Sequence, residues 1–168
     1  MTADNGTNAD GVTIERDVVY NQDPRRPLTL HLLRPAGPAV GARPAIAYFF
    51  GGAIRQGSKD RGIDVLLPFA RRGYDCASAE YRLSGEAVFP AAVRDCKCAI
   101  RFLRANSAAL GIDPNRIGAC GHSSGGYMAT MLGVTGGVAA LEGTAAGRTP
   151  PARSRLSATG SARQSSCA

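Results

Sequence analysis

The sequence predicts an α/β fold, with a mostly parallel sheet of about five strands and flanking helices. Three observations indicate this class. Short apolar runs between proline- and glycine-rich turns alternate along the chain with segments of helical apolar spacing. Residues 45–50 are continuously apolar, as in a parallel strand covered on both faces. Residues 116–129 have the pattern of a strand, a sharp turn and a helix.

After three expected strands, helices and strands alternate along the chain. Strands are expected at residues 12–20, 28–34, 45–50, 74–81 and 117–120, and helices within 58–72, at 90–110 and at 124–134. The helix at 90–110 has the clearest apolar periodicity, and its basic residues are expected to face solvent. These basic residues are Arg94, Lys97, Arg101 and Arg104. Asp113-Pro114-Asn115 predicts a type I turn before the last strand.

Length and composition fit one globular domain with disordered ends. The chain has 168 residues, of which 44% are hydrophobic and 20% charged. Residues 1–11 are small and polar and are expected to be disordered. Residues 143–168 form an Ala/Ser/Arg-rich tail that is also expected to be disordered, because it offers almost no apolar surface to bury. The tail is basic, since it contains Arg148, Arg153, Arg155 and Arg163 and no acidic residue.

Charge and hydropathy argue against nucleic-acid and membrane partners. The basic face of the helix at 90–110 lacks interleaved aromatic residues, so we expect no nucleic acid partner. A nucleic-acid binder acting through the arginine tail is an alternative. No apolar run reaches the length of a membrane span and the first ten residues lack a basic start, so a cytoplasmic location is expected. The five cysteines are an odd number without a C-x-x-C pair, which favours free thiols over a metal site or a disulfide.

The chemistry of the chain is predicted at a G-x-S-x-G pattern centred on Ser123. A turn between strand and helix would hold Ser123 at its tip. Glycine at Gly121 and Gly125 would let the neighbouring backbone pass without a Cβ clash. The Ser124 N–H would then point to the same side, at the start of a helix whose dipole favours negative charge. Ser123 is therefore the candidate nucleophile, and an ordinary glycine-rich turn is the alternative.

Five motifs follow one another along the chain. They are Phe50-Gly-Gly-Ala-Ile-Arg-Gln-Gly-Ser58, Glu80-Tyr-Arg-Leu-Ser84, Phe89-Pro-Ala-Ala-Val-Arg-Asp95, Gly111-Ile-Asp-Pro-Asn-Arg-Ile117 and Gly121-His-Ser-Ser-Gly-Gly126. In this order and spacing they resemble the first half of an α/β-hydrolase, of the hormone-sensitive-lipase-like and carbohydrate-esterase type. The resemblance runs from about residue 13 to residue 142 and implies a truncated α/β-hydrolase fold, with residues 12–142 as a partial domain. It implies an esterase or lipase that acts on small acyl esters without a cofactor or a metal.

The resemblance also implies an oxyanion hole made by three backbone N–H groups. They belong to Gly52, Ala53 and Ser124. Small residues let such groups converge on one point, and each donor is worth about 3 kcal/mol in a transition state. The chain departs from the family at Phe50, where the family has a histidine that braces the loop. A plain glycine turn after a strand is the alternative. Arg82 and Asp95 are expected to form a structural ion pair rather than to act in catalysis.

A serine hydrolase of this fold needs an acid and a histidine after the nucleophile. After Ser123 the sequence contains one acid, Glu142, and no histidine. His122 is not expected to act as the base, because its side chain leaves the turn in another direction. His31 is expected to be a surface residue on the exposed face of its strand. We therefore expect an impaired hydrolase. The alternatives are a hydrolase whose missing groups come from a partner chain, and a non-catalytic or vestigial fragment.

The strand before the nucleophile is central in the fold that the chain resembles. No strand for the place on one of its sides is found in the sequence, so residues 117–120 are expected to form an open edge. Natural edge strands are protected by charges, prolines or bulges, and these residues carry none of them. Self-association through this edge is therefore expected.

Overall fold

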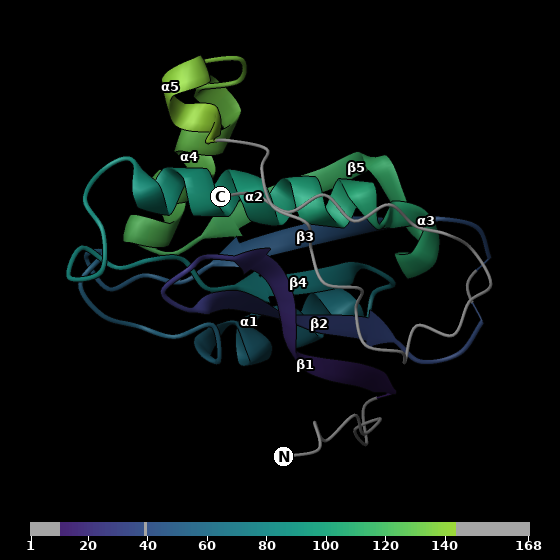
Figure 1. The fold of residues 1–168 in the computed structure, drawn as a ribbon. Helices are drawn as coiled ribbons and strands as arrows, with labels where there is room; N and C mark the ends of the chain where they lie inside the picture. Colours follow the sequence, from purple (N-terminus) through teal and green to yellow (C-terminus); the bar gives the residue numbers. More distant parts are fainter. Residues whose placement is uncertain (1–10, 39, 144–168) are drawn as a thin grey trace.

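A five-stranded sheet with helices on both faces forms the centre of the molecule (Figure 1). The computed structural model describes residues 11–38 and 40–143. The ends that the sequence predicts to be disordered lie outside the described residues, apart from Gly11 and Gly143. Within the described ranges, no helix combines the length and the apolarity that crossing a membrane requires.

All five predicted strands are present and occupy one sheet. They are β1 (Val12–Gln22), β2 (Pro27–Pro35), β3 (Arg43–Phe49), β4 (Asp75–Ala79) and β5 (Ile112–Gly121). Their spatial order is β1-β2-β4-β3-β5. β3 pairs in parallel with both β4 and β5, whereas β2 pairs antiparallel with both β1 and β4. The sheet is therefore mixed, and its parallel half leads to the candidate nucleophile.

β5 is the edge strand next to β3, as expected, and no second strand pairs with it in the part of the chain that the structure describes. Its pairing with β3 is interrupted after Ile112 and resumes at Ile117. The turn predicted at 113–115 falls in this interruption, inside β5 rather than before it. The Asn115 N–H donates to the Asp113 carboxylate over 2.9 Å. The strand begins earlier than predicted because β3 also pairs with Ile112.

Among the described residues, five helices connect the strands or follow them. They are α1 (Arg61–Ala70), α2 (Ala91–Ala105), α3 (Ser107–Leu110), α4 (Ser124–Val134) and α5 (Ala139–Glu142). α1 packs on one face of the sheet against β2 and β4, and α2 lies on the other face with α4 beside it (Figure 1). The helix predicted at 90–110 is divided into α2 and α3. The division falls at buried Asn106, whose side-chain amide donates to the Phe102 carbonyl over 2.8 Å.

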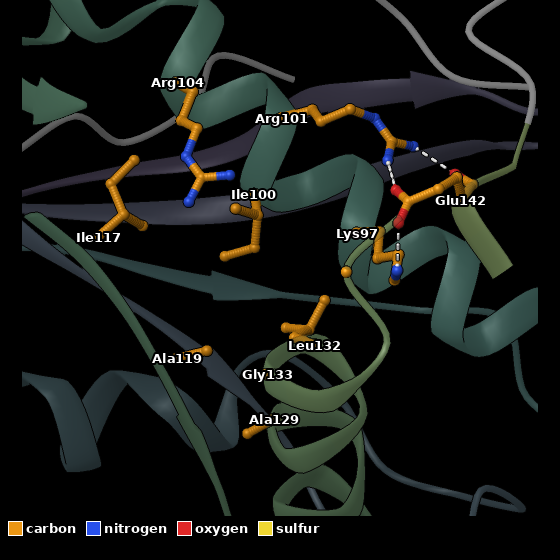
Figure 2. A pocket seen from close by; sticks show the side chains of 11 residues that line it. Lys97, Ile100, Arg101, Arg104, Ile117, Ala119, Ala129, Leu132, Gly133 and Glu142 are labelled. Carbon is orange, nitrogen blue, oxygen red and sulfur yellow. Dashed lines mark hydrogen bonds and ion pairs between the residues drawn. The ribbon is translucent and has the colours of Figure 1, made fainter. Parts of the chain in front are cut away.

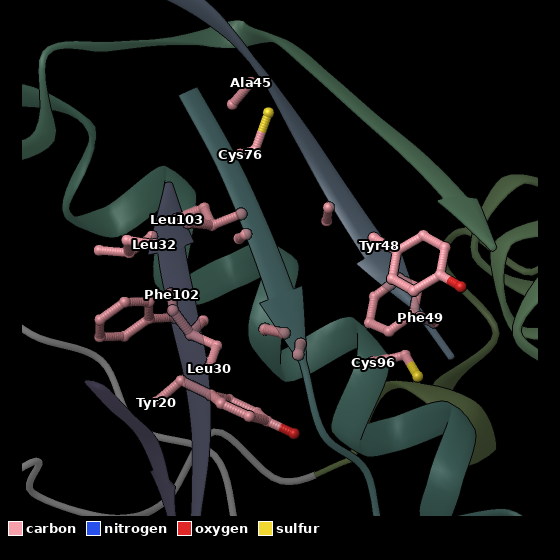
Figure 3. Close-up of a cluster of buried hydrophobic side chains, with 14 of the residues drawn as sticks. Tyr20, Leu30, Leu32, Ala45, Tyr48, Phe49, Cys76, Cys96, Phe102 and Leu103 are labelled. Atoms are coloured by element: carbon pink, nitrogen blue, oxygen red, sulfur yellow. The ribbon is translucent and has the colours of Figure 1, made fainter. Parts of the chain in front are cut away.

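An apolar core lies between the sheet and its helices (Figure 3). It includes Tyr20, Leu30, Leu32, Phe49, Phe102 and Leu103, each at most 5% exposed. Cys76, Cys96 and Cys98 are buried free thiols, and Cys120 is a half-buried one. Burial raises the pKa of the Cys76 thiol to about 12, so this thiol stays protonated at neutral pH. The predicted free thiols are thus confirmed for these four cysteines, and Cys167 lies outside the described residues.

His31 is buried, which corrects the prediction that it lies on an exposed strand face. It is only 2% exposed. Its Nε2 atom lies 2.8 Å from Asp60 Oδ1, and its Nδ1 atom accepts a hydrogen bond from the Asp17 N–H over 3.2 Å. Apolar and polar residues alternate along β2, but α1 and the segment before it cover the polar face. Alternation predicts which side chains share a face, and it does not predict what packs against that face.

Lys97 is also buried, although the sequence predicts that it faces solvent with the other basic residues of α2. It is 5% exposed, and its Nζ atom donates to the Thr135 carbonyl over 2.6 Å and pairs with Glu142 at 2.5 Å. Arg101 binds the same carboxylate. The segment after α4 therefore covers this side of α2, and Arg104 is the exposed member of the four.

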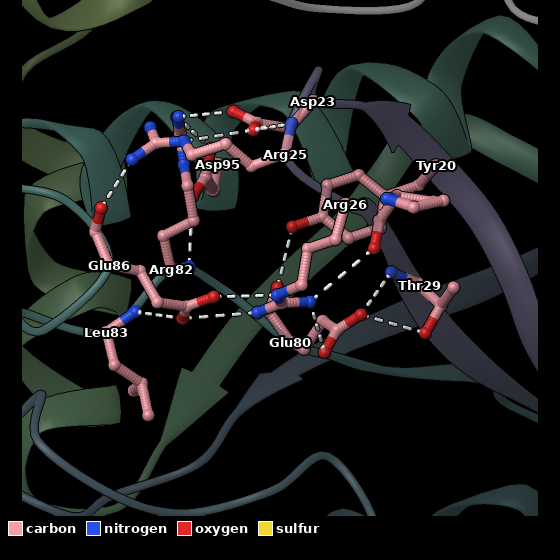
Figure 4. Close-up of polar contacts among 11 residues, drawn as sticks. Tyr20, Asp23, Arg25, Arg26, Thr29, Glu80, Arg82, Leu83, Glu86 and Asp95 are labelled. Atoms are coloured by element: carbon pink, nitrogen blue, oxygen red, sulfur yellow. Dashed lines mark hydrogen bonds and ion pairs between the residues drawn. The ribbon is translucent and has the colours of Figure 1, made fainter.

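A network of ion pairs joins the segment after β4 to the turn between β1 and β2 (Figure 4). The predicted pair of Arg82 and Asp95 is confirmed, because two guanidinium nitrogens lie 2.7 and 2.8 Å from the carboxylate oxygens. A third Arg82 contact reaches Asp23 at 2.6 Å. Burial raises the pKa of the Asp95 carboxyl, and Arg82 partly offsets this rise. A neighbouring pair in the network, Arg26 with Glu86 at 2.6 Å, was not predicted from the sequence.

Removal of the Arg82 guanidinium should destabilise the fold. Arg82→Met would leave the Asp95 carboxylate, which is 1% exposed, without its charge partner. Breaking one side of a buried ion pair costs about 3–5 kcal/mol, and we expect the free energy of unfolding in urea to fall by that amount. Arg116→Met is the matched control, because Arg116 pairs with Asp113 on the surface and should change stability little. Equal losses in the two variants would contradict the prediction.

Candidate active site

Ser123 stands at the tip of a tight turn between β5 and α4, where the G-x-S-x-G pattern predicts it. Its backbone angles are φ 54° and ψ −119°, a region that residues other than glycine rarely enter. Such a conformation costs on the order of 1–3 kcal/mol and persists only where the surrounding structure imposes it. The side chain is exposed. The strand, turn and helix predicted around Ser123 are thus present, with the serine in a strained conformation.

The turn at residues 121–125, called the elbow below, contains glycines that allow two backbone segments to meet. A Cβ atom on Gly121 would lie 2.4 Å from the Gly125 carbonyl carbon. A Cβ atom on Gly125 would lie 1.9 Å from the Phe49 carbonyl oxygen. Non-bonded atoms do not approach so closely. The end of β3 therefore passes directly against the elbow, and the predicted need for glycine at both positions has a steric cause.

The segment after β3, residues 50–57, is strained in the same way and is called the glycine loop below. Three successive residues have positive φ: Gly52 at 140°, Ala53 at 55° and Ile54 at 61°. The Gly52 carbonyl accepts hydrogen bonds from two N–H groups that follow it in the loop. A Cβ atom on Gly51 would lie 2.5 Å from the His122 carbonyl oxygen. The glycine loop is therefore held tightly turned and in contact with the elbow.

Three N–H groups of the glycine loop and the elbow have no acceptor among the described residues. They belong to Gly52, Ala53 and Ser124, which are the donors that the resemblance implies. The Ser124 N–H is also the first of α4, where the helix dipole adds partial positive charge. Unbonded N–H groups beside a serine can stabilise negative charge that develops on a neighbouring oxygen. The three groups that the resemblance implies as oxyanion donors are thus without another acceptor in the described part of the chain.

Phe50 occupies the position at which the resemblance implies a histidine, and it is 2% exposed. Its ring stacks on Tyr81, with ring centroids 4.5 Å apart and an interplanar angle of 13°. The Tyr81 hydroxyl donates a hydrogen bond to the Phe50 carbonyl over 2.7 Å. Tyr81 therefore braces the start of the glycine loop, a contact that sequence analysis missed. The available signal for it is its place in the motif at 80–84.

The Ser123 hydroxyl has no hydrogen bond to a histidine or to another side chain within the described ranges. His122 is exposed, and His31 is buried in another contact. Glu142, the one acid after Ser123 in the sequence, binds two basic residues of α2. The Lys97 ammonium holds the pKa of its carboxyl below its usual range. A candidate nucleophile and candidate oxyanion donors are thus in place, and no general base contacts the serine there.

A groove of about 410 Å³ runs along the open edge of the sheet, between α2, β5 and α4 (Figure 2). Apolar side chains line it from all three elements: Ile100 of α2, Ile117 and Ala119 of β5, and Ala129 and Leu132 of α4. Arg104 lines it near Ile117 and has no ion-pair partner in the described part of the chain. Ser123 does not line this groove, which is therefore separate from the elbow.

The fold and the site together define an α/β-hydrolase of the esterase type, in which a parallel strand leads into a strained serine elbow beside a glycine loop. The family model of BD-FAE matches residues 30–158, more than half of the sequence. The chain belongs to the BD-FAE family. The matched segment begins later than the resemblance predicted from the motifs, and it continues past Glu142 into the predicted tail.

Similar proteins are esterases by name. Esterase LipC of Mycobacterium tuberculosis is 34% identical over 123 residues, which cover 71% of this chain and 30% of LipC. Isoprenylcysteine alpha-carbonyl methylesterase ICME of Arabidopsis thaliana is 33% identical over 116 residues, which cover 69% of this chain and 26% of ICME. The chain spans about a third or less of these relatives.

Solved esterase structures share the fold. The thermophilic esterase Est2 of Thermogutta terrifontis superposes with a TM-score of 0.65 at 34% identity, covering 72% of this chain and 43% of Est2. A bacterial heroin esterase superposes with a TM-score of 0.66 at 31% identity, covering 74% of this chain and 40% of that enzyme. The chain therefore spans less than half of each solved relative.

Gly125→Ala should destabilise the elbow, because the added Cβ would collide with the Phe49 carbonyl. Overpacking of this kind costs about 1–3 kcal/mol, which we expect as a loss in the free energy of unfolding in urea. Gly133→Ala is the matched control in the same helix, since an added Cβ there meets no atom within 4 Å. This control should gain about 0.5–1 kcal/mol, because alanine is the better helix former. A stable Gly125→Ala chain would show that the close contact is not required.

Proposed function

We propose that the chain belongs to a serine-dependent carboxylic ester hydrolase in which Ser123 is the nucleophile. One observation carries the proposal: an exposed, strained serine lies beside three N–H groups that have no acceptor among the described residues. Backbone strain of this kind clusters at active sites. The names of the similar proteins support the same reaction class, since they are esterases.

In the proposed reaction, the Ser123 hydroxyl oxygen attacks the carbonyl carbon of a small acyl ester. The carbonyl oxygen becomes an oxyanion that accepts hydrogen bonds from the N–H groups of Gly52, Ala53 and Ser124. Each such donor lowers the barrier by about 3 kcal/mol. The tetrahedral intermediate expels the alcohol, and water then hydrolyses the acyl-serine to the free acid. The attack releases a proton and the departing alcohol takes one up, so an efficient reaction needs a general base.

The proposal includes slow chemistry at Ser123, because no general base contacts it among the described residues. Loss of the base from a serine hydrolase lowers turnover by about a millionfold. A partner chain that supplies a histidine would restore an efficient reaction. A non-catalytic role of the fold is the alternative, and the two differ in whether Ser123 reacts with an electrophile.

Paraoxon tests whether Ser123 is a nucleophile. Thermogutta terrifontis esterase 2, a similar structure, has been solved phosphorylated by paraoxon. Attack of Ser123 on phosphorus would transfer the diethylphosphoryl group to the serine, release p-nitrophenolate and give the hydroxyl proton to solvent. We expect slow labelling of one site, which mass spectrometry should locate at Ser123, and no labelling of Ser123→Ala. Ser107→Ala, a change in α3, should label like the parent.

Two outcomes of this experiment would reject the proposal. Labelling that persists in Ser123→Ala would place the reactive group elsewhere. A parent chain that stays unlabelled after prolonged incubation would favour the non-catalytic role. Fast labelling would support Ser123 as the nucleophile and overturn the slow chemistry, and His122→Ala would then identify or exclude the nearest histidine as the base.

We also propose that the chain self-associates through the β5 edge. In the described part of the chain, β5 pairs on one side with β3, and its exposed residues Gly118 and Ala119 are too small to block the approach of a strand. Every second residue of such an edge directs its N–H and C=O groups outward, where another strand can pair with them. A second copy presents the same uncharged residues 117–121, and an antiparallel pair of these segments would satisfy both edges.

Ala119→Lys should weaken this association, because a lysine on an edge strand resists pairing with another strand. We expect the average mass measured by light scattering to fall towards that of a monomer. Ala108→Lys is the control, since Ala108 is exposed in α3 and away from the edge. A parent chain that is already a uniform monomer, or equal effects of the two lysines, would exclude pairing through β5.

A further inference from the structure

We propose that Tyr81 is a positioning residue that holds the glycine loop and the elbow together, so that their N–H groups converge on one oxyanion. This inference rests on the proposed function, because it gives Tyr81 a part in the same reaction. Tyr81 lies two residues after the end of β4 and is 1% exposed. A side chain so deeply buried acts through the backbone that it holds rather than through contact with a substrate.

The first contact of Tyr81 fixes the start of the glycine loop. Its hydroxyl donates to the Phe50 carbonyl over 2.7 Å. That carbonyl belongs to the peptide unit that leads into Gly51, and a peptide unit is planar. The hydrogen bond therefore fixes the plane from which Gly52 and Ala53 turn into their positive φ. Strained residues in succession need an anchor of this kind, because local preference opposes their conformation.

The aromatic ring of Tyr81 holds the same residue from the side. Phe50 and Tyr81 stack with centroids 4.5 Å apart. Gly57, the last residue of the glycine loop, also lies against Phe50, because a Cβ atom on Gly57 would be 2.5 Å from the Phe50 ring. The loop thus closes around the Phe50 side chain, which rests on Tyr81.

The Phe50 carbonyl that Tyr81 holds also lies against the elbow. A Cβ atom on Gly125 would lie 2.7 Å from the Phe50 carbonyl oxygen, the atom that accepts the Tyr81 hydrogen bond. The Ser124 hydroxyl oxygen is buried and has no hydrogen-bond partner among the described residues. Burial raises the pKa of Tyr81, and the nearby Ser124 hydroxyl partly offsets this rise. Tyr81 therefore holds the carbonyl at which the glycine loop and the elbow meet, and these two segments carry the three proposed oxyanion donors.

Tyr20 offers a matched control for a test of Tyr81. It is fully buried, and it also donates its hydroxyl to a backbone carbonyl, that of Glu80, over 2.6 Å. This acceptor lies in the peptide unit that leads into Tyr81, and it belongs to neither the glycine loop nor the elbow. Tyr20→Phe is therefore a strict control, because it disturbs the backbone beside Tyr81 and keeps the Tyr81 hydroxyl on the Phe50 carbonyl. Tyr20→Phe and Tyr81→Phe therefore remove the same chemical group from the same kind of hydrogen bond at two different places.

The experiment compares the parent, Tyr81→Phe and Tyr20→Phe as purified full-length chains. Phosphorylation of Ser123 by paraoxon is followed over a range of concentrations, which separates the saturating rate from the half-saturating concentration. We expect Tyr81→Phe to lower the saturating rate about tenfold or more, because misplaced oxyanion donors act on the transition state. The half-saturating concentration should change less than about twofold, and Tyr20→Phe should leave both values within about twofold.

Hydrogen exchange gives a second readout that does not depend on reactivity. Amides of residues 51–57 and 122–126 should exchange faster in Tyr81→Phe than in Tyr20→Phe, while those of β4 stay alike. If both variants label and exchange at the rates of the parent, the inference is wrong. If both variants lose the same amount of labelling rate and of amide protection, it is also wrong, because such losses would reflect stability alone.

Labelling of the parent tests the proposed function, and the comparison of the two variants tests this inference. If the parent is not labelled at Ser123, the proposed nucleophile is wrong, and hydrogen exchange then decides whether Tyr81 joins the loop to the elbow. If Tyr81→Phe does not fold, Phe50→Leu replaces it, because this change removes the stacking and keeps the carbonyl acceptor. Exchange and labelling in Phe50→Leu should then change in the same direction, and unchanged values would reject the part of the role that rests on stacking.

Discussion

The contact between the end of β3 and the elbow is the constraint on which the rest of the site depends. Gly125 lies so close to the Phe49 carbonyl that no side chain fits between them. β3 and β5 stay in parallel register up to Phe49 and Gly121, so both strands end at the same edge of the sheet. The chain must turn sharply after each strand to avoid the other. The backbone strain at Ser123 and in the glycine loop follows from these two sharp turns at the same edge of the sheet.

The elbow could be predicted from the sequence because its signals are local. A glycine two residues before Ser123 and another two residues after it allow one kind of turn, and neighbouring residues decide whether that turn is sterically allowed. The strands could be located for the same reason, since each has its own apolar pattern. Their order in the sheet is a property of pairing between distant segments, which a resemblance to a known fold can imply and a periodicity cannot.

The residues whose environment was predicted wrongly, or not predicted, make their contacts with residues distant in the sequence. His31 is covered by Asp60, 29 residues away, and Lys97 by Glu142, 45 residues away. Tyr81 reaches the Phe50 carbonyl across 31 residues. Periodicity places these side chains on a face of a strand or helix. Whether that face meets solvent, an ion pair or a backbone carbonyl depends on the tertiary fold.

The backbone angle at Ser123 sets folding and chemistry against each other. Glycine would accept a φ of 54° without steric cost, whereas serine does not. Requirements of folding alone therefore favour glycine at this position, and only a need for the hydroxyl favours serine. In a lineage that no longer used the reaction, replacement of this serine by glycine would be advantageous rather than neutral, because it would relieve the strain. The residue at position 123 thus records, across descendants of this gene, whether the chemistry is still under selection.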